Sequence, residues 1–213
     1  MIERPVQRTA ASLREATDTA HRRAEQEPFI ADLMAGRRSA GDLARLTGQL
    51  RPIYAALESR VGAMRSRGDL ASLLDPRLDR LAALDHDLAV MAGDDVAQLT
   101  RPLAATDALV GRLGDIGDDP PRLLAHHYVR YLGDLSGGQI IARLMRQHYA
   151  VPDDALTFYA FDELGSKGGF KHRYRAALDE LVAESSFYDA MLDEAQRAYE
   201  ANRQVFVGLG ASA

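Results

Sequence analysis

Three glycines lie within residues 131–139, a segment whose other residues have strongly helical periodicity. Glycine in a helix interior costs about 0.5–1 kcal/mol relative to alanine, so three in so short a stretch require a reason. Gly133 and Gly137 are four residues apart and share one helical face, with Gly138 beside them. A face without side chains lets another object approach the backbone. The segment predicts a helix lying over something flat, although close packing of two helices through Gly133 and Gly137 is an alternative.

Composition limits the class of protein. The chain has 213 residues, 46% hydrophobic and 27% charged, which is typical of one globular domain with a sizeable core. It contains no cysteine, which excludes disulfides, thiolate nucleophiles and cysteine-ligated metals and suits the cytoplasm. No signal peptide or membrane-spanning run is found, so we expect no membrane association. A net charge of −5 argues against nucleic-acid binding.

Helical periodicity extends through almost the whole chain, without sustained strand-type alternation. We therefore predict an all-α fold, a single-domain helical bundle over residues 1–213, with a core from about 12 to 207 and short flexible termini. A capping box of Ser12 and Glu15 is expected to begin the first helix, and Gly208 to end the last. The predicted helices cover residues 12–28, 42–67 (bent or broken at Pro52), 71–91 in pieces, 96–113, 123–149, 153–164, 170–184 and 187–207, with a flexible turn at 165–169.

The first predicted helix carries a histidine at the edge of its apolar stripe. The stripe consists of Leu13, Ala16, Ala20 and Ala24. His21 lies beside it, and Glu25 follows one helical turn later. A lone pair of this kind is most simply a histidine at the core edge with an exposed partner. The alternative is a metal-ligating imidazole whose other ring nitrogen hydrogen-bonds to the carboxylate.

Charged residues near these two segments fit the second interpretation. Arg14 precedes His21 by seven residues, which is roughly 10 Å along a helix axis. A guanidinium at that distance can pair with an anionic group at the rim of a large planar ligand. Arg130 and Asp134 are four residues apart and lie within reach of the glycine face.

Two motifs together resemble the haem oxygenase family. They are the His–Glu segment at residues 13–25 and the glycine segment at 128–139, in the family's order and at a similar separation. Supporting matches occur at residues 53–58, 170–175 and 202–206, so the resemblance covers most of the chain. It implies the haem oxygenase fold, with haem between the first helix and a glycine-kinked distal helix.

The resemblance also implies roles for individual residues. His21 matches the ligand of the haem iron, and Glu25 its hydrogen-bonding partner. The glycines Gly133, Gly137 and Gly138 match positions where backbone lies against haem and oxygen. Asp134 matches the carboxylate that orders water on that side and relays protons. The polar network behind this water matches Tyr54, Arg130 and Asn202.

At the haem edge, the resemblance implies residues that hold the propionates and set which meso carbon is oxidised. These are Arg14, Tyr128, Lys171 and Arg175, and Phe206 is a further haem-binding residue. Arg14 stands where lysine is more usual, which keeps the charge, and Lys167 is a competitor of Lys171. A basic rim of Arg14, Arg22, Arg23, Lys171, Arg173 and Arg175 could steer an acidic electron donor.

The implied activity is oxygen-dependent cleavage of haem b, which is both substrate and cofactor, at the α-meso carbon. The products would be biliverdin, ferrous iron and carbon monoxide. The chain has no flavin or nicotinamide fingerprint, so electrons would come from a ferredoxin or a flavin- or NAD(P)H-dependent reductase. We expect a cytoplasmic monomer of the bacterial type. Iron acquisition, bilin supply and haem turnover all fit as physiological roles.

Two other classes compete with this interpretation. A haem carrier or storage protein would need His21 and the propionate-binding residues but no proton relay, so Asp134 with its network argues against it. A ferritin-like di-iron bundle would use two Glu-x-x-His pairs, and the sequence contains none. His126 and His127 are adjacent, so they face different directions on a helix and are expected to be surface or packing residues. His86 is expected to be solvated.

Overall fold

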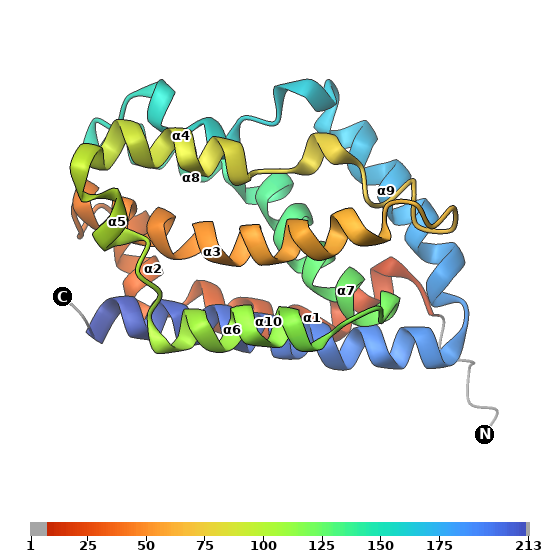
Figure 1. Ribbon diagram of the computed structural model, residues 1–213. Helices are drawn as coiled ribbons and strands as arrows, with labels where there is room; N and C mark the ends of the chain where they lie inside the picture. Colours follow the sequence, from red (N-terminus) through yellow and green to blue (C-terminus); the bar gives the residue numbers. More distant parts are fainter. Residues whose placement is uncertain (1–7, 212–213) are drawn as a thin grey trace.

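The computed structural model describes residues 8–211, and within this range every regular element is helical (Figure 1). The expectation of an all-α fold is confirmed. The α-helices are α1 (Ala10–Glu25), α2 (Pro28–Met34), α3 (Ala40–Met64), α4 (Leu81–Ala92), α5 (Val96–Leu99), α6 (Ala104–Asp115), α7 (Pro120–His127), α8 (Gly133–Tyr149), α9 (Lys167–Val182) and α10 (Ser185–Ala211). No helix within residues 8–211 has the length and apolarity needed to cross a bilayer.

The helices surround one apolar core. Helix α3 packs between α4 and α6, and α10 packs along α1 and α7 (Figure 1). The fully buried side chains come from all of these helices and include Leu13, Leu43, Ile53, Leu57, Leu84, Leu123, Met145, Leu178 and Met191. Burying apolar surface is the main favourable term in folding. This packing fixes the positions of α1 and α10 relative to α7 and α8.

Helix α1 begins earlier than the sequence predicted. Its N-cap is Thr9, whose hydroxyl accepts from the backbone of Ser12 at 3.1 Å, while the Ser12 hydroxyl accepts from the Thr9 backbone at 2.9 Å. The capping box predicted for Ser12 and Glu15 is therefore wrong, because Ser12 is the third helical residue and not the cap. The expected flexible termini lie only partly within the described residues, since 1–7 and 212–213 fall outside them.

The buried face of α1 also differs from the predicted stripe. Leu13 and Ala24 are buried as expected, but Ala16 is exposed and Thr17 is buried in its place. The Thr17 hydroxyl donates to the carbonyl of Leu13 at 2.9 Å, so its polar atom is satisfied inside the protein. Threonine can therefore occupy a core position that hydrophobicity alone assigns to its apolar neighbour.

Two further boundaries in the N-terminal half differ from expectation. Helix α2 was not predicted and begins at Pro28, where a proline without an N–H costs nothing in the first helical turn. A bend or a break was expected at Pro52, and the break does not occur, since helix α3 is continuous past this residue. The surrounding packing of α4 and α6 holds this helix together despite the local cost of proline.

The C-terminal third shows three more differences. The helix predicted at 153–164 is a series of short 3-10 turns at Asp153–Ala155, Thr157–Tyr159 and Asp162–Leu164. Helix α9 already begins at Lys167, capped by the Ser166 hydroxyl, so most of the predicted flexible turn at 165–169 is helical. Helix α10 continues through Gly208 to Ala211. Packing against α1, α2, α6 and α7 stabilises α10 beyond its glycine.

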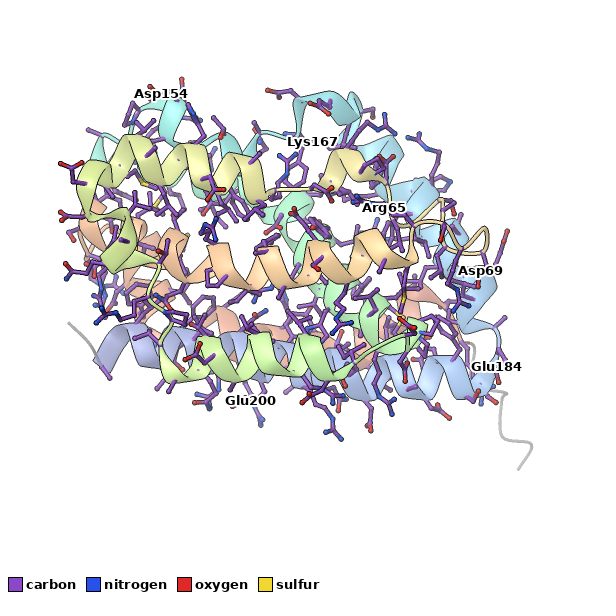
Figure 2. The ribbon with its side chains drawn as sticks, viewed as in Figure 1. Arg65, Asp69, Asp154, Lys167, Glu184 and Glu200 are labelled. Atoms are coloured by element: carbon purple, nitrogen blue, oxygen red, sulfur yellow. The ribbon has the colours of Figure 1, made fainter. Side chains whose placement is uncertain are left out.

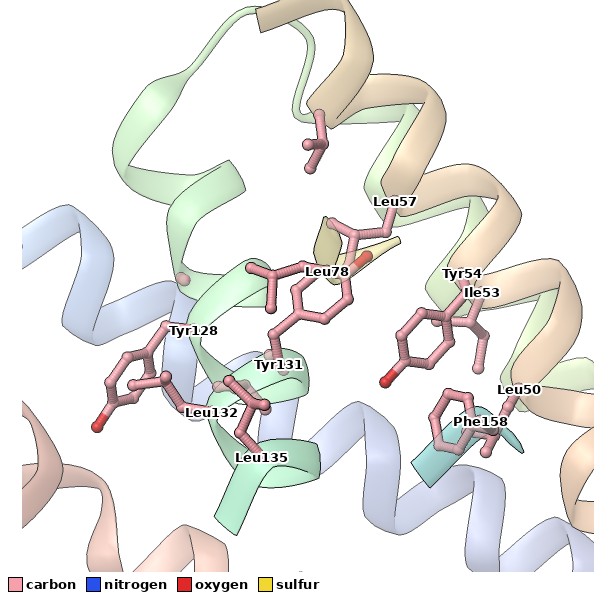
Figure 3. Packing of buried hydrophobic residues seen from close by; sticks show 14 of the residues in the cluster. Leu50, Ile53, Tyr54, Leu57, Leu78, Tyr128, Tyr131, Leu132, Leu135 and Phe158 are labelled. Atoms are coloured by element: carbon pink, nitrogen blue, oxygen red, sulfur yellow. The ribbon is translucent and has the colours of Figure 1, made fainter. Parts of the chain in front are cut away.

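A π-helical segment, Tyr128–Leu132, joins α7 to the glycine-bearing helix α8. The extra residue in each turn widens the helix directly before Gly133. Tyr128 lies on one side of this segment and Tyr54 of α3 on the other, where Tyr131 contacts it with ring centroids 5.7 Å apart (Figure 3). Short π-helical insertions often mark functional sites, and here one lies at the start of the glycine face.

The histidines at the end of α7 are both buried packing residues. His126 Nε2 lies 3.0 Å from Glu194 on α10, and Arg112 on α6 donates to the same carboxylate from Nε at 2.8 Å. His127 Nδ1 lies 2.8 Å from the Tyr174 hydroxyl on α9. Burial alone would raise the pKa of Glu194, but hydrogen bonds from Arg112 and His126 overcome this and lower it to about 2. Arg112 and His126 therefore link α6 and α7 to α10 through the Glu194 carboxylate.

Glu194→Gln is expected to lower the free energy of unfolding at pH 7 by about 3 kcal/mol, because it removes the charge that Arg112 and His126 surround. The pKa of Glu194 is lower in the folded protein, so its contribution is present above about pH 4.5 and is lost as the pH falls toward about 2. Urea unfolding measures both effects. Asp193→Asn, an exposed neighbour on the same helix, is the matched control. Equal losses in the two variants would contradict this prediction.

Candidate functional site

Two adjoining cavities lie between α1, α8 and α10. The larger has a volume of about 350 Å³ and the smaller about 190 Å³. Three residues line both of them: His21 from α1, Gly133 from α8 and Tyr199 from α10. Because the two cavities share these residues, we treat them as one slot, with the larger as its outer part and the smaller as its inner part.

His21 lies where the two parts of the slot meet. Its Nε2 is 3.3 Å from Oε1 of Glu25, and both side chains are substantially exposed. The ring of Tyr199 contacts the imidazole edge to face, with centroids 5.4 Å apart. Tyr199 was not predicted as a site residue, although its position three residues before Asn202 places the two on neighbouring parts of one helical face.

The outer part of the slot is cationic. Arg14 from α1 and Lys171 and Arg175 from α9 all line it, together with Tyr128. Burial raises the pKa of the Tyr128 hydroxyl, while Arg175 and Arg14 oppose this rise. Lys171 Nζ donates to the Ser136 hydroxyl on α8 at 3.2 Å. The structure thus brings together all four residues that the sequence assigned to an anionic ligand edge.

Lys167, which the sequence offered as a competitor of Lys171, does not line either part of the slot. It is the first residue of α9 and lies at the end of that helix (Figure 2). Lys171 and Arg175 follow one and two turns later, and only these reach the outer part. The early start of α9 therefore separates the two lysines by a helical turn.

The three glycines of α8 have different surroundings. A Cβ atom at Gly133 would meet nothing within 4 Å, and one at Gly137 would meet only Ile141 of the same helix. Close packing of a second helix on this pair, the alternative raised by the sequence, is therefore wrong. Gly138 is buried, and a Cβ there would come within 3.2 Å of the Tyr159 ring. Gly138 thus allows packing against Tyr159. Gly137 and Gly138 line neither part of the slot, contrary to their expected place against the ligand.

The inner part of the slot contains a polar network among apolar residues. Tyr54 from α3 donates its hydroxyl hydrogen to the Asp134 carboxylate. Arg130 donates to the amide oxygen of Asn202 on α10, and its guanidinium lies 5.6 Å from the centroid of the Tyr54 ring. All four side chains line the inner part, as does Phe206. The sequence predicted this set, and the structure brings its members together.

One carboxylic acid of this network has a pKa close to neutral pH. Burial raises the pKa of Asp134 to about 6, against the hydrogen bond from Tyr54 and the positive charges of Arg130 and Arg80. Burial and the adjacent Asp134 raise the pKa of Tyr54 well above its usual range, so its hydroxyl stays protonated. Asp134 can therefore exchange a proton near neutral pH while Tyr54 keeps donating to it.

Together these features fit a haem-sized ligand. The slot offers a histidine, an open glycine backbone, apolar lining at its inner end and three cations at its outer end. A planar macrocycle with an anionic edge matches each of these properties, and imidazole is a common axial ligand of haem iron. The fold and the site thus define an all-α haem-binding protein.

Comparisons with known proteins agree with this class. A family model described as "Heme oxygenase" matches residues 7–207. Heme oxygenase 1 from Synechocystis is 32% identical over 198 residues, covering 92% of this chain and 82% of the relative, and Heme oxygenase 1 from Gallus gallus is 35% identical over 202 residues, covering 92% and 68%. The crystal structure of heme oxygenase-1 from Synechocystis in complex with heme aligns with a TM-score of 0.89 and 31% identity, over 95% of this chain and 92% of that chain. The structure of heme oxygenase from Leptospira interrogans aligns with a TM-score of 0.87 and 34% identity, over 92% and 97%.

The chain therefore belongs to the haem oxygenase family, oxidoreductases that degrade haem. The resemblance identified from the His–Glu and glycine segments is confirmed.

Proposed function

We propose that this protein cleaves haem at the α-meso carbon, using O₂ and externally supplied electrons, and releases biliverdin, ferrous iron and carbon monoxide. The observation that carries this proposal is the single slot shared by His21, the open backbone at Gly133 and the Tyr54–Asp134 pair. A haem carrier would need the first of these but not a carboxylic acid whose pKa lies near 6. Cleavage is therefore the function that best explains the inner part of the slot.

On the α1 side, His21 would hold the haem iron through one ring nitrogen, with Glu25 Oε1 placed 3.3 Å from the imidazole to orient the ring. Haem, when bound, supplies the iron that activates O₂ and the meso carbon that is oxidised. Glu25 accepts the proton of the other ring nitrogen and so orients the imidazole. Its side chain is 64% exposed, so water weakens its electrostatic pull on that proton.

On the α8 side, the residues leave space beside the ligand and supply protons. Gly133 places no side chain over the ligand, which leaves room for a small molecule and for ordered water. Asp134 hydrogen-bonds this water and passes protons through it. The Tyr54 hydroxyl holds the Asp134 carboxylate in place through a hydrogen bond. Arg130, which donates to Asn202, lies over the Tyr54 ring and supports it.

Aerobic turnover of the haem-reconstituted protein with ascorbate tests this function. Loss of the Soret band together with the appearance of biliverdin absorbance is the expected result. A stable ferric or oxygenated spectrum over the same period would instead identify a carrier. Quantifying released carbon monoxide and iron checks the stoichiometry.

The cations of the outer part are proposed to hold the propionates and so select the α-meso carbon. Replacing both Lys171 and Arg175 with alanine is expected to give a mixture of biliverdin isomers, because the macrocycle can then rotate in the slot. Chromatography of the products measures the mixture. Lys167→Ala, which removes a charge outside the slot, is the control and should keep a single isomer. A pure α product from the double variant would refute this assignment.

The electron donor is proposed to be an acidic ferredoxin or a flavin- or NAD(P)H-dependent reductase. The basic rim on α1 and α9 supports this, because Arg23 and Arg173 are exposed on the same two helices that supply the cations of the outer part. Arg22 is less available, since it pairs with Asp18 at 2.5 Å. The cysteine-free sequence suits a cytoplasmic protein, and a monomer is the state proposed.

Turnover driven by such a donor is expected to fall about threefold to tenfold when ionic strength rises from about 0.05 to 0.5 M, because salt screens the attraction between the two surfaces. Initial rates of biliverdin formation measure this. Turnover driven by ascorbate needs no protein donor and serves as the control. Equal salt dependence with both reductants would remove the basic rim from donor binding.

A further inference from the structure

Helix α4 carries a buried carboxylate that does not line the slot. Asp87 is 1% exposed and accepts three hydrogen bonds from one short segment. Oδ1 accepts from the Thr157 backbone at 2.9 Å and from its hydroxyl at 2.6 Å, and Oδ2 accepts from the Phe158 backbone at 2.9 Å. Within residues 8–211 it forms no ion pair with a lysine or arginine. Its hydrogen bonds to Thr157 and Phe158 lower its pKa, but burial outweighs them and raises the pKa above the usual value.

The segment that Asp87 holds, Thr157–Tyr159, reaches the inner part of the slot, which Phe158 and Tyr159 both line. The Phe158 ring contacts Tyr54 edge to face, with centroids 5.2 Å apart (Figure 3). Tyr131 makes a similar contact with Tyr54 at 5.7 Å. The Tyr54 ring is thus fixed by two aromatic neighbours, and Phe158 is the one that Asp87 anchors.

The same segment also contacts α8. The Tyr159 ring lies against Gly138, where a Cβ would be only 3.2 Å away. The Gln139 side chain donates to the Tyr159 carbonyl at 2.8 Å. Thr157–Tyr159 therefore contacts both the helix that carries Tyr54 and the helix that carries Asp134.

We propose that Asp87 is a positioning residue: by holding Thr157–Tyr159 against α4, its carboxylate sets the geometry of the Tyr54–Asp134 hydrogen bond from outside the slot. The effect of Asp87 on turnover rests on the proposed function, whereas its effect on the Tyr54–Asp134 hydrogen bond does not require haem. Asp87 touches neither ligand nor reacting atoms and acts only through the rings of Phe158 and Tyr159.

Asp87→Asn is the first test variant, because its amide group places a donor against the Phe158 or Thr157 backbone N–H and loosens the segment. The readout is the titration of the Asp134 carboxyl, followed by ¹³C NMR in the haem-free, full-length protein. Besides the hydrogen bond from Tyr54, the positive charges of Arg130 and Arg80 act on the Asp134 carboxyl. Losing the hydrogen bond from Tyr54 is expected to raise the titration midpoint by about 0.5 pH unit or more.

The direction of the shift separates positioning from a direct charge effect. Removing a negative charge at Asp87 would by itself lower the pKa of Asp134, whereas displacing Tyr54 raises it. Thr157→Val removes the hydroxyl's 2.6 Å hydrogen bond to Asp87 and its weaker 3.4 Å bond to the Ala83 carbonyl, and it keeps both backbone hydrogen bonds to Asp87. It should give a smaller upward shift without any change of charge. Asp85→Asn, an exposed acid on the same helix that pairs with Arg51, is the matched control and should leave the midpoint unchanged.

In the haem complex, Asp87→Asn is expected to lower kcat for biliverdin formation by about threefold to tenfold with little change in KM. If Asp87→Asn does not fold, Thr157→Val decides the question. Folded variants whose Asp134 midpoint is unchanged or lower would overturn the proposal, even if their thermal stability falls. A wild-type protein that binds haem without cleaving it would refute the proposed function, and the NMR titration would still test Asp87.

Discussion

Replacing His21 with alanine is expected to abolish ligation of the haem iron and to reduce biliverdin formation by more than about 100-fold. Even the hydrogen-bond partners of metal-ligating histidines contribute roughly 10–100-fold to affinity or activity, so loss of the ligand itself should cost more. In the structure His21 lines both parts of the slot, and no second histidine lines either part. The ferric and ferrous spectra of the haem complex, together with turnover rates, measure the effect.

Two controls make this test specific. His148→Ala removes an exposed imidazole at the end of α8 and should leave both spectrum and rate unchanged. Added free imidazole should partly restore the spectrum of His21→Ala by entering the vacated space. If the wild-type spectrum persists in His21→Ala without imidazole, His21 is not the ligand.

Replacing Asp134 with alanine is expected to preserve haem binding but reduce biliverdin formation by about 10²–10⁴-fold, the usual contribution of a positioned proton-transfer group. The carboxylate accepts from Tyr54 and lines the inner part of the slot, so it is placed to hold water beside the ligand. The rate at saturating haem and the dissociation constant of haem separate the two effects. Full retention of biliverdin output would remove Asp134 from the relay.

Asp134→Asn refines this test through pH. Asparagine can still accept from Tyr54 but cannot carry a proton. The wild-type rate should show an inflection near pH 6, where burial places the pKa of Asp134. The inflection should disappear in Asp134→Asn, while the slower residual rate becomes flat in that range. An inflection that persists would assign this ionisation to another group.

Most of the helices were predictable because each has a sustained apolar period, but their ends were not. Thr9 caps α1 instead of Ser12, and α10 continues past Gly208. Capping depends on which of several nearby hydroxyls finds a free backbone N–H, and helix length depends on the neighbours a helix packs against. Neither property is encoded in a window of local sequence.

The candidate site shows the same division. Local spacing was sufficient to pair His21 with Glu25 and to place Arg130 beside Asp134 on one helix, because a helical turn has fixed dimensions. Spacing could not show that Gly138 packs against Tyr159, or that Tyr199 contacts His21. Those contacts join segments far apart in the chain.

By itself, the sequence determined the helical class, the histidine helix, the glycine helix and the types of residue that the chemistry requires. Only the tertiary structure decided which glycine is open, which lysine reaches the slot and how Asp87 on α4 supports Tyr54. The physical reason is the distance along the chain over which each kind of interaction acts. Helical periodicity and local hydrogen bonds act within a few residues, whereas burial, pKa shifts and ring contacts depend on what the rest of the chain places alongside.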